Sequence, residues 1–67
     1  MDSPDEILVE ADVYAMIERL NIMESHIRQY IPSTLFLKES GEPNVHTRWG
    51  AILYHLQYMR ATLRSFL

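Results

Sequence analysis

Residues 9–30 read VEADVYAMIERLNIMESHIRQY, and apolar side chains recur in this segment at alternating spacings of four and three residues. Such spacing places them along one side of an α-helix, in the heptad pattern of packed helices. The apolar residues of this seam are Val9, Val13, Met16, Leu20, Met23, Ile27 and Tyr30. With Val13 at heptad position a, Ile17 and Ile31 fall at e and widen the stripe to the a/d/e face of a helix bundle. The segment therefore predicts an amphipathic helix that packs against other helices.

The ends of this helix are marked by residues on either side of the seam. Ser3 can accept hydrogen bonds from the free amides of a first helical turn, Pro4 suits that turn, and Glu6 completes a capping box. Pro32 disfavours helical backbone at the residue before it. We therefore predict a first helix over about residues 4–30.

The C-terminal third of the chain repeats the same spacing. Its seam residues are Val45, Trp49, Ile52, Leu56, Met59, Leu63 and Phe66, with Leu53 and Leu67 added at e. Asn44 directly follows Pro43 and is a good N-cap, which predicts a second helix over about residues 44–66. Folded back antiparallel on the first helix, it would bring Leu20 against Leu56 and fill every a and d layer. Gly50 falls at the outward position b, where we expect a close contact with another helix.

Residues 31–43 predict a loop, because they hold two prolines and the turn-like Ser40-Gly41-Glu42. Within this loop, Leu35-Phe36-Leu37 are three consecutive apolar residues, which are poorly suited to water. We interpret them as a cap over the open end of the core, formed as a short helical turn. The alternative is a loop that docks a partner through Leu35 and Phe36.

Length and composition point to self-association. The chain has 67 residues and no cysteine, so neither disulfides nor thiolate metal sites can stabilise it. A domain of about 60 residues buries only about 60% of the surface of its unfolded chain, so a lone hairpin would be marginally stable. We predict an all-α fold, a single helical-hairpin domain over residues 1–67 that is antiparallel, has a long loop and dimerises into a four-helix bundle. Two residues at c and two at e are the candidates for self-association, namely Leu8 and Ile22 at c and Ile17 and Leu53 at e.

Charge divides the chain into two parts. Residues 1–24 contain seven acids and one arginine, net −6, whereas residues 25–67 contain five basic residues and two acids, net +3. Antiparallel pairing is expected to bring the acids of the N-terminal segment near Arg60 and Arg64. We also expect His26 and His55 to face arginines, so that acid weakens the assembly.

The sequence offers little for chemistry. His26, His46 and His55 are the histidines, and no Glu-x-x-His pair of the kind that builds di-iron bundles occurs on either helix. No Gly-x-Ser-x-Gly turn and no glycine-rich phosphate loop are present. We therefore expect no catalytic, metal or cofactor-binding residues and no enzyme activity.

Binding of another protein is the favoured function. Tyr54 and Tyr58 with Arg60 and Arg64 form a strip of the residue types that are enriched at protein interfaces. The same strip could contact phosphates and stack bases, so a nucleic-acid-binding regulator is an alternative, although the chain is acidic overall. A structural subunit of a larger assembly is the third possibility. We predict an adaptor, inhibitor or assembly factor that binds itself and a larger protein.

No membrane partner is expected. The longest uncharged run, Trp49 to Met59, has eleven residues, whereas a membrane-spanning helix needs about 20. The start of the chain is acidic where a signal peptide would be basic. We therefore expect a cytoplasmic protein.

Overall fold

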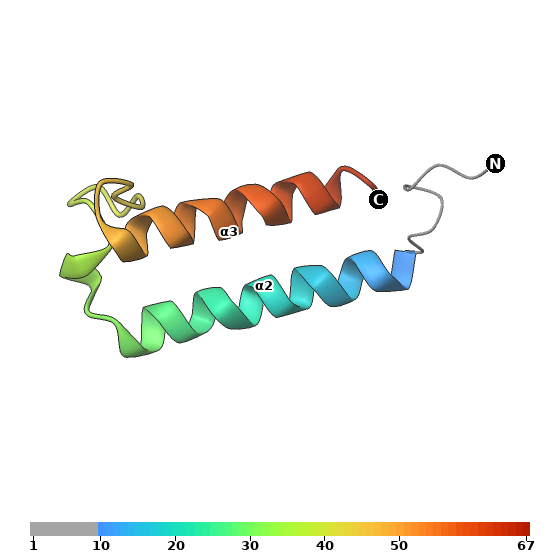
Figure 1. Cartoon of the computed structure of the whole chain (residues 1–67), viewed down its shortest axis with the longest axis horizontal. Helices are drawn as coiled ribbons and strands as arrows, with labels where there is room; N and C mark the ends of the chain where they lie inside the picture. The colour runs from blue at the N-terminus through green and yellow to red at the C-terminus, as the bar shows by residue number, and fades with distance from the viewer. Residues whose placement is uncertain (1–9) are drawn as a thin grey trace.

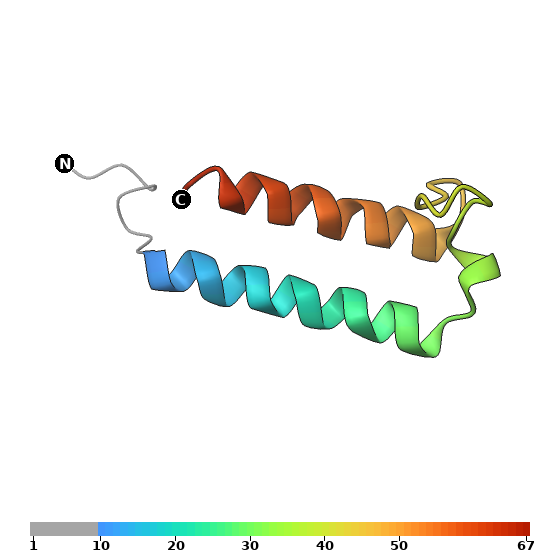
Figure 2. The ribbon, with the colours of Figure 1, turned by 180° about the vertical axis from the view of Figure 1, so that it is seen from behind.

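The computed structural model describes residues 10–67, and within this range it is a hairpin of two helices. Helix α2 spans Glu10–Tyr30, a 3₁₀ helix η1 spans Ser33–Leu35, and helix α3 spans Arg48–Arg64. The two long helices run antiparallel beside each other, with the loop at one end and the C-terminus at the other (Figures 1 and 2). No strand occurs between residues 10 and 67, so the prediction of an all-helical hairpin is confirmed. The predicted helix start at residue 4 and Leu8 lie outside the described residues.

Helix α2 ends just before Pro32, as predicted from the sequence. Tyr30 is its last residue, and the Ile31 amide still donates to the Ile27 carbonyl over 2.9 Å. Pro32 follows with extended backbone, φ −57° and ψ 135°, because its ring cannot continue the helical hydrogen bonds. The chain therefore leaves α2 sharply and turns toward the start of α3.

The loop between the helices is ordered by its own backbone hydrogen bonds. After η1, Leu37 and Pro43 form an isolated antiparallel bridge, and the Lys38 amide donates to the Glu42 carbonyl over 2.8 Å. The turn between them needs Gly41, whose φ of +90° strains a residue with a side chain. Phe36 is 1% exposed and belongs to the core. The interpretation of this segment as a cap over the core is thus confirmed for Phe36 and in part for Leu37, which packs against the core, whereas Leu35 is 53% exposed.

Helix α3 begins later than predicted, with Thr47 rather than Asn44 as its N-cap. The Thr47 hydroxyl accepts from the Gly50 amide over 3.0 Å and donates to the Asn44 carbonyl over 2.7 Å. The Asn44 side chain instead accepts from the His46 amide at 3.1 Å, which closes a turn ahead of the helix. The predicted range 44–66 was therefore wrong at its start, and α3 also ends two residues earlier, at Arg64.

Gly50 is buried, which corrects its expected outward position. A Cβ atom built on Gly50 would overlap the Asn44 carbonyl oxygen and crowd the Thr47 hydroxyl. The close contact expected at this glycine therefore exists, but it is made by the loop and not by another helix.

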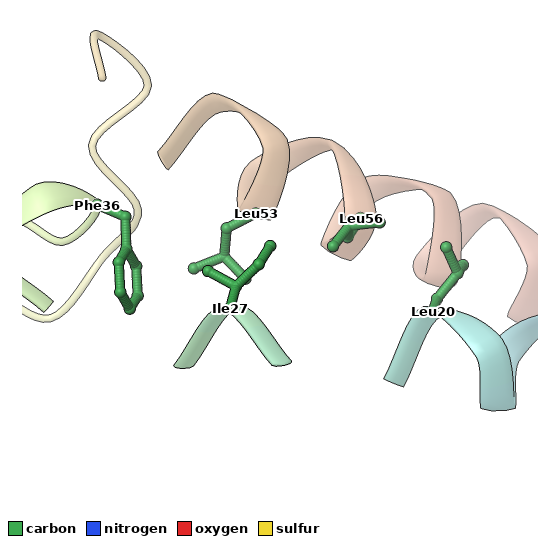
Figure 3. Packing of buried hydrophobic residues seen from close by; sticks show 5 residues of the cluster. All are labelled: Leu20, Ile27, Phe36, Leu53 and Leu56. Carbon is green, nitrogen blue, oxygen red and sulfur yellow. The ribbon is translucent and has the colours of Figure 1, made fainter. Parts of the chain in front are cut away.

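The core uses one edge of the predicted stripe. Its buried side chains fall at a and e, while the d residues of both helices stay on the surface. The buried hydrophobic residues are Val13, Ile17, Leu20, Ile27, Phe36, Leu53 and Leu56. Figure 3 shows Phe36 at the loop end of this cluster, near Leu53 and Ile27, with Leu56 and Leu20 further along the helices. The expectation that one hairpin fills the d layers was therefore wrong.

The helices are also shifted relative to the predicted register. Pairing Leu20 with Leu56 would place Glu24 opposite Ile52, but Glu24 instead contacts Gln57 and Arg60. The shift amounts to more than one helical turn and follows from the late start of α3, because residues 44–47 belong to the loop.

Candidate functional site

One side of the hairpin carries a polar network that joins the two helices. Arg60 donates to Glu24 over 2.5 Å and to the Asn21 side-chain oxygen over 2.7 Å. Glu24 also accepts from Arg28 over 3.1 Å and from the Gln57 amide over 3.5 Å. The Glu24 side chain is only 13% exposed, so this cluster excludes much of the water around it.

Sequence patterning contained a signal for this network that the charge argument missed. Glu24 and Arg60 both occupy heptad position e, between the apolar e residues Ile17 and Ile31 on one helix and Leu53 and Leu67 on the other. Because packing uses e, the two opposite charges meet across the helix pair. The acids expected beside Arg60 were those near the N-terminus, and of these Glu10 and Asp12 form no ion pair in the described structure.

The environment of Glu24 favours its ionised form. Burial raises its pKa, but hydrogen bonds from Arg60 and Arg28, the positive charge of Arg60 and the hydrogen bond from Gln57 together outweigh burial. The pKa of Glu24 therefore lies below its ordinary value of 4.5. The network is a charged bridge that stabilises the hairpin at neutral pH.

The opposite side of the hairpin is apolar and uncovered. We call it the open face, and it consists of d residues with one a residue at the loop end. Each side chain of the open face is between 37% and 71% exposed. Its residues are Met16, Met23, Tyr30, Trp49, Ile52 and Met59. Large apolar side chains that gather on one side in this way are characteristic of an interaction surface.

Two hollows lie along the open face. The larger, of about 450 Å³, lies between α2 and α3, with Met16 and Met59 at its walls and Arg19 and Thr62 at its rim. The smaller, of about 180 Å³, lies at the loop end between Tyr30 and Trp49 and also includes His26. Residues of both helices thus line each hollow, Met16 and Met59 the larger one and Tyr30 and Trp49 the smaller one.

The structure buries several residues that were predicted to contact other molecules. Ile17 and Leu53, assigned to self-association, and Phe36, assigned to partner binding, lie inside the hairpin core. Their side chains already pack within one chain, so they are not available on its surface. Ile22 is 49% exposed and Leu35 is 53% exposed, so these two remain accessible.

The predicted strip of tyrosines and arginines is divided between two surfaces. Tyr58 lines the larger hollow of the open face, whereas Tyr54 lines a different hollow of about 390 Å³ with Gln57. The latter hollow is built mainly from loop residues and includes Lys38, Glu42, Pro43 and Val45. Arg60 is occupied by Glu24, while Arg64 is exposed near the end of α3. These four residues do not form one continuous site.

Within residues 10–67, no group of three or more histidine, aspartate or glutamate side chains is arranged to hold a metal ion. Neither α2 nor α3 is long and apolar enough to cross a membrane.

Comparisons of the chain with protein-family models, with curated proteins and with solved structures find no match. The candidate site therefore rests on the geometry of the open face.

Proposed function

We propose that this hairpin is a small non-enzymatic protein-binding module that acts as a homodimeric four-helix bundle. The observation that supports the proposal most is the open face, which presents six large apolar side chains along one side of the helix pair. Covering that face with a second hairpin completes a bundle with the d residues inside. In such a bundle, residues at all three positions of the predicted a/d/e stripe would face the core.

The area of the open face is compatible with a dimer. A fully exposed aromatic side chain offers about 150–250 Å², so six side chains near half exposure offer roughly 500 Å² per protomer. Ile22, Tyr58 and the partly exposed Leu63 extend this surface. A typical stable interface buries about 800 Å² per partner, which the open face and its neighbours approach.

A second, different protein would bind outside the dimer interface. The hollow around Tyr54 and the exposed Arg64 lie away from the open face, so they stay available when the open face is covered. The module would act by occupying a surface of the larger partner, as an adaptor, an inhibitor or an assembly factor does. A cytoplasmic location stays a prediction from the sequence.

Nucleic acid is a weaker alternative than another protein. Arg60 and Arg64 would have to contact the phosphates, but the Arg60 guanidinium already donates to Glu24 and Asn21. A subunit of a larger scaffold would show masses above that of a dimer.

The mass of the purified protein in solution tests the proposal. We expect sedimentation equilibrium to give about twice the chain mass of 7.9 kDa at micromolar concentration. Met23→Glu introduces a charge into the open face and should yield a monomer that remains helical. Ser25→Glu introduces the same charge at an exposed α2 position away from the open face and should remain dimeric. A monomeric wild-type protein would contradict the dimer.

Binding of a second protein is tested separately. Tyr54→Ala and Arg64→Ala should keep the dimer mass and helicity but lose a partner that the wild-type protein retains in a pull-down. Retention of the same partner by both variants would place its binding site elsewhere.

A further inference from the structure

Two symmetric arrangements can cover the open face with a second copy of the chain. If the twofold axis runs parallel to the helices, α2 of each protomer packs on α3 of its partner and both loops lie at the same end. If the axis runs across the helices, α2 packs on the partner's α2, α3 packs on the partner's α3, and the loops lie at opposite ends. Neighbouring helices are antiparallel in both cases, so helix direction does not distinguish them.

We propose that the dimer has the first arrangement, with α2 of one protomer on α3 of the other. This inference rests on the proposed homodimer and specifies how its two copies meet. Three features support it: the net charge of each helix, the basic residues at the rim of the open face, and the two hollows along that face.

The net charges of the helices favour contact between unlike helices. Helix α2 contains four acids and two arginines, net −2, whereas α3 contains three arginines and no acid, net +3. Packed helices lie about 8–10 Å apart, which is within the screening length at physiological salt. Pairing α2 with the partner's α3 therefore places opposite net charges together, while the second arrangement places like charges together twice.

The rim of the open face supports the same choice. Arg19 and Thr62 line one hollow and thus lie at the same height, and one heptad further toward the loop His26 and His55 occupy the equivalent positions. In the first arrangement height is preserved, so Arg19 faces the partner's Thr62 and His26 faces the partner's His55.

The second arrangement reverses height about the middle of the open face. The ion pair between Glu24 and Arg60 places the residues that precede them, Met23 and Met59, at similar heights there. Arg19 then faces the partner's His26, and the α2 rim would thus place an arginine beside a histidine, a pairing that the first arrangement avoids.

The two hollows of the open face also match best in the first arrangement. The larger hollow, lined by Met16 and Met59, meets the same hollow of the partner, and flexible methionines can fill its 450 Å³ from both sides. The aromatic residues Tyr30 and Trp49 likewise meet their own copies at the loop end. The second arrangement would pack rigid aromatic rings against the methionine hollow.

Cysteine cross-linking can distinguish the arrangements, because the chain has no cysteine of its own. The central residues Met23 of α2 and Met59 of α3, which precede the paired Glu24 and Arg60, are the positions to substitute. In the first arrangement Met23 faces the partner's Met59. In the second, Met23 faces the partner's Met23 and Met59 faces the partner's Met59.

The experiment uses full-length Met23→Cys carrying an N-terminal tag and untagged Met59→Cys, oxidised alone and after mixing at equal amounts. We expect the mixed disulfide, identified by its intermediate mass on a non-reducing gel, to exceed either homodisulfide at least about five-fold. Ser25→Cys, exposed on α2 away from the open face, is the control and should give only background cross-linking in every mixture.

Each other outcome has a defined meaning. Rapid homodisulfide formation by Met23→Cys and by Met59→Cys alone would overturn the proposed arrangement in favour of the second one. A dimer mass without cross-links above the Ser25→Cys background would overturn the use of the open face. A monomer mass for the wild-type protein would contradict the proposed homodimer itself, which distinguishes that failure from the other two.

Discussion

Gly50 shows how one residue can reverse the usual effect of a helix substitution. Glycine to alanine in a helix normally gains up to about 1 kcal/mol of stability, because alanine loses less backbone entropy on folding. At Gly50 the added methyl group would overlap the Asn44 carbonyl, which is backbone and cannot move without opening the turn ahead of α3. The glycine is thus required by the junction between loop and helix.

Gly50→Ala is therefore expected to lower the free energy of unfolding by about 1–3 kcal/mol, the usual cost of overpacking. Thermal unfolding followed by circular dichroism at 222 nm measures this change. Ala61→Gly, at an exposed α3 position, is the reference for propensity alone and should cost about 1 kcal/mol. A more stable Gly50→Ala protein would show that this junction differs from the one described.

Glu24 makes stability depend on pH at the acidic end of the range. Folding lowers the pKa of Glu24, because the ionised carboxylate interacts with Arg60 and Arg28 in the folded state and loses these interactions on unfolding. The stabilisation is complete above its ordinary value of 4.5 and is lost as the pH falls through the lower pKa of the folded protein. Urea unfolding between pH 6 and pH 3 should show this loss.

Glu24→Gln should be about 1–2 kcal/mol less stable than the wild-type protein at pH 6, since hydrogen bonds to a charged group are replaced by weaker ones. The difference should shrink toward pH 3. Glu18→Gln, which removes an exposed acid of the same helix, provides the comparison. If both variants behave alike at all pH values, the bridge contributes nothing beyond general charge.

At the scale of elements, the loop places one fully buried side chain in the core, and Leu37 packs against that core from outside. Phe36 is 1% exposed, while its neighbour Leu35 is 53% exposed. Phe36→Ala should cost about 3–5 kcal/mol, which is enough to unfold much of a small hairpin. Leu35→Ala should change stability by less than about 0.5 kcal/mol. Equal effects in thermal unfolding would mean that the segment does not cap the core.

The sequence predicted the elements better than their edges. Heptad spacing was sufficient to predict the two helices, and Pro32 was sufficient to predict the end of α2. The start of α3 could not be read from Asn44 alone, because asparagine also closes turns, and here its side chain accepts from His46 while Thr47 caps the helix. Local spacing does not decide between these two uses of one side chain.

The candidate site was predicted only in part, for a similar reason. An apolar stripe at a, d and e shows which side of a helix is buried in the final assembly, but not which edge meets its own hairpin partner. Packing through a and e buried Ile17 and Leu53 and left Met23 and Ile52 outside. The choice of edge depends on where the loop delivers α3, which is a property of the whole fold.

For the molecule as a whole, proposed assembly and stability are linked. The hairpin buries seven large hydrophobic residues and leaves fourteen exposed in the range 10–67, so much of its apolar surface is still in water. If a second copy covers the open face, unfolding becomes coupled to dissociation.

The melting temperature should then rise by several degrees when the protein concentration increases a hundred-fold. The Met23→Glu variant should melt at a lower temperature that is independent of concentration. Differential scanning calorimetry at two concentrations measures both. A concentration-independent wild-type transition would show that the hairpin folds alone.

The bridge between Glu24 and Arg60 has a further consequence for growth of the assembly. Because it places ionised groups beside the core, it interrupts the apolar surface on that side of the helix pair. Association through the open face alone would close on itself after two chains. A hairpin with a continuous apolar face on both sides could stack into open fibres, and the charged bridge works against such growth.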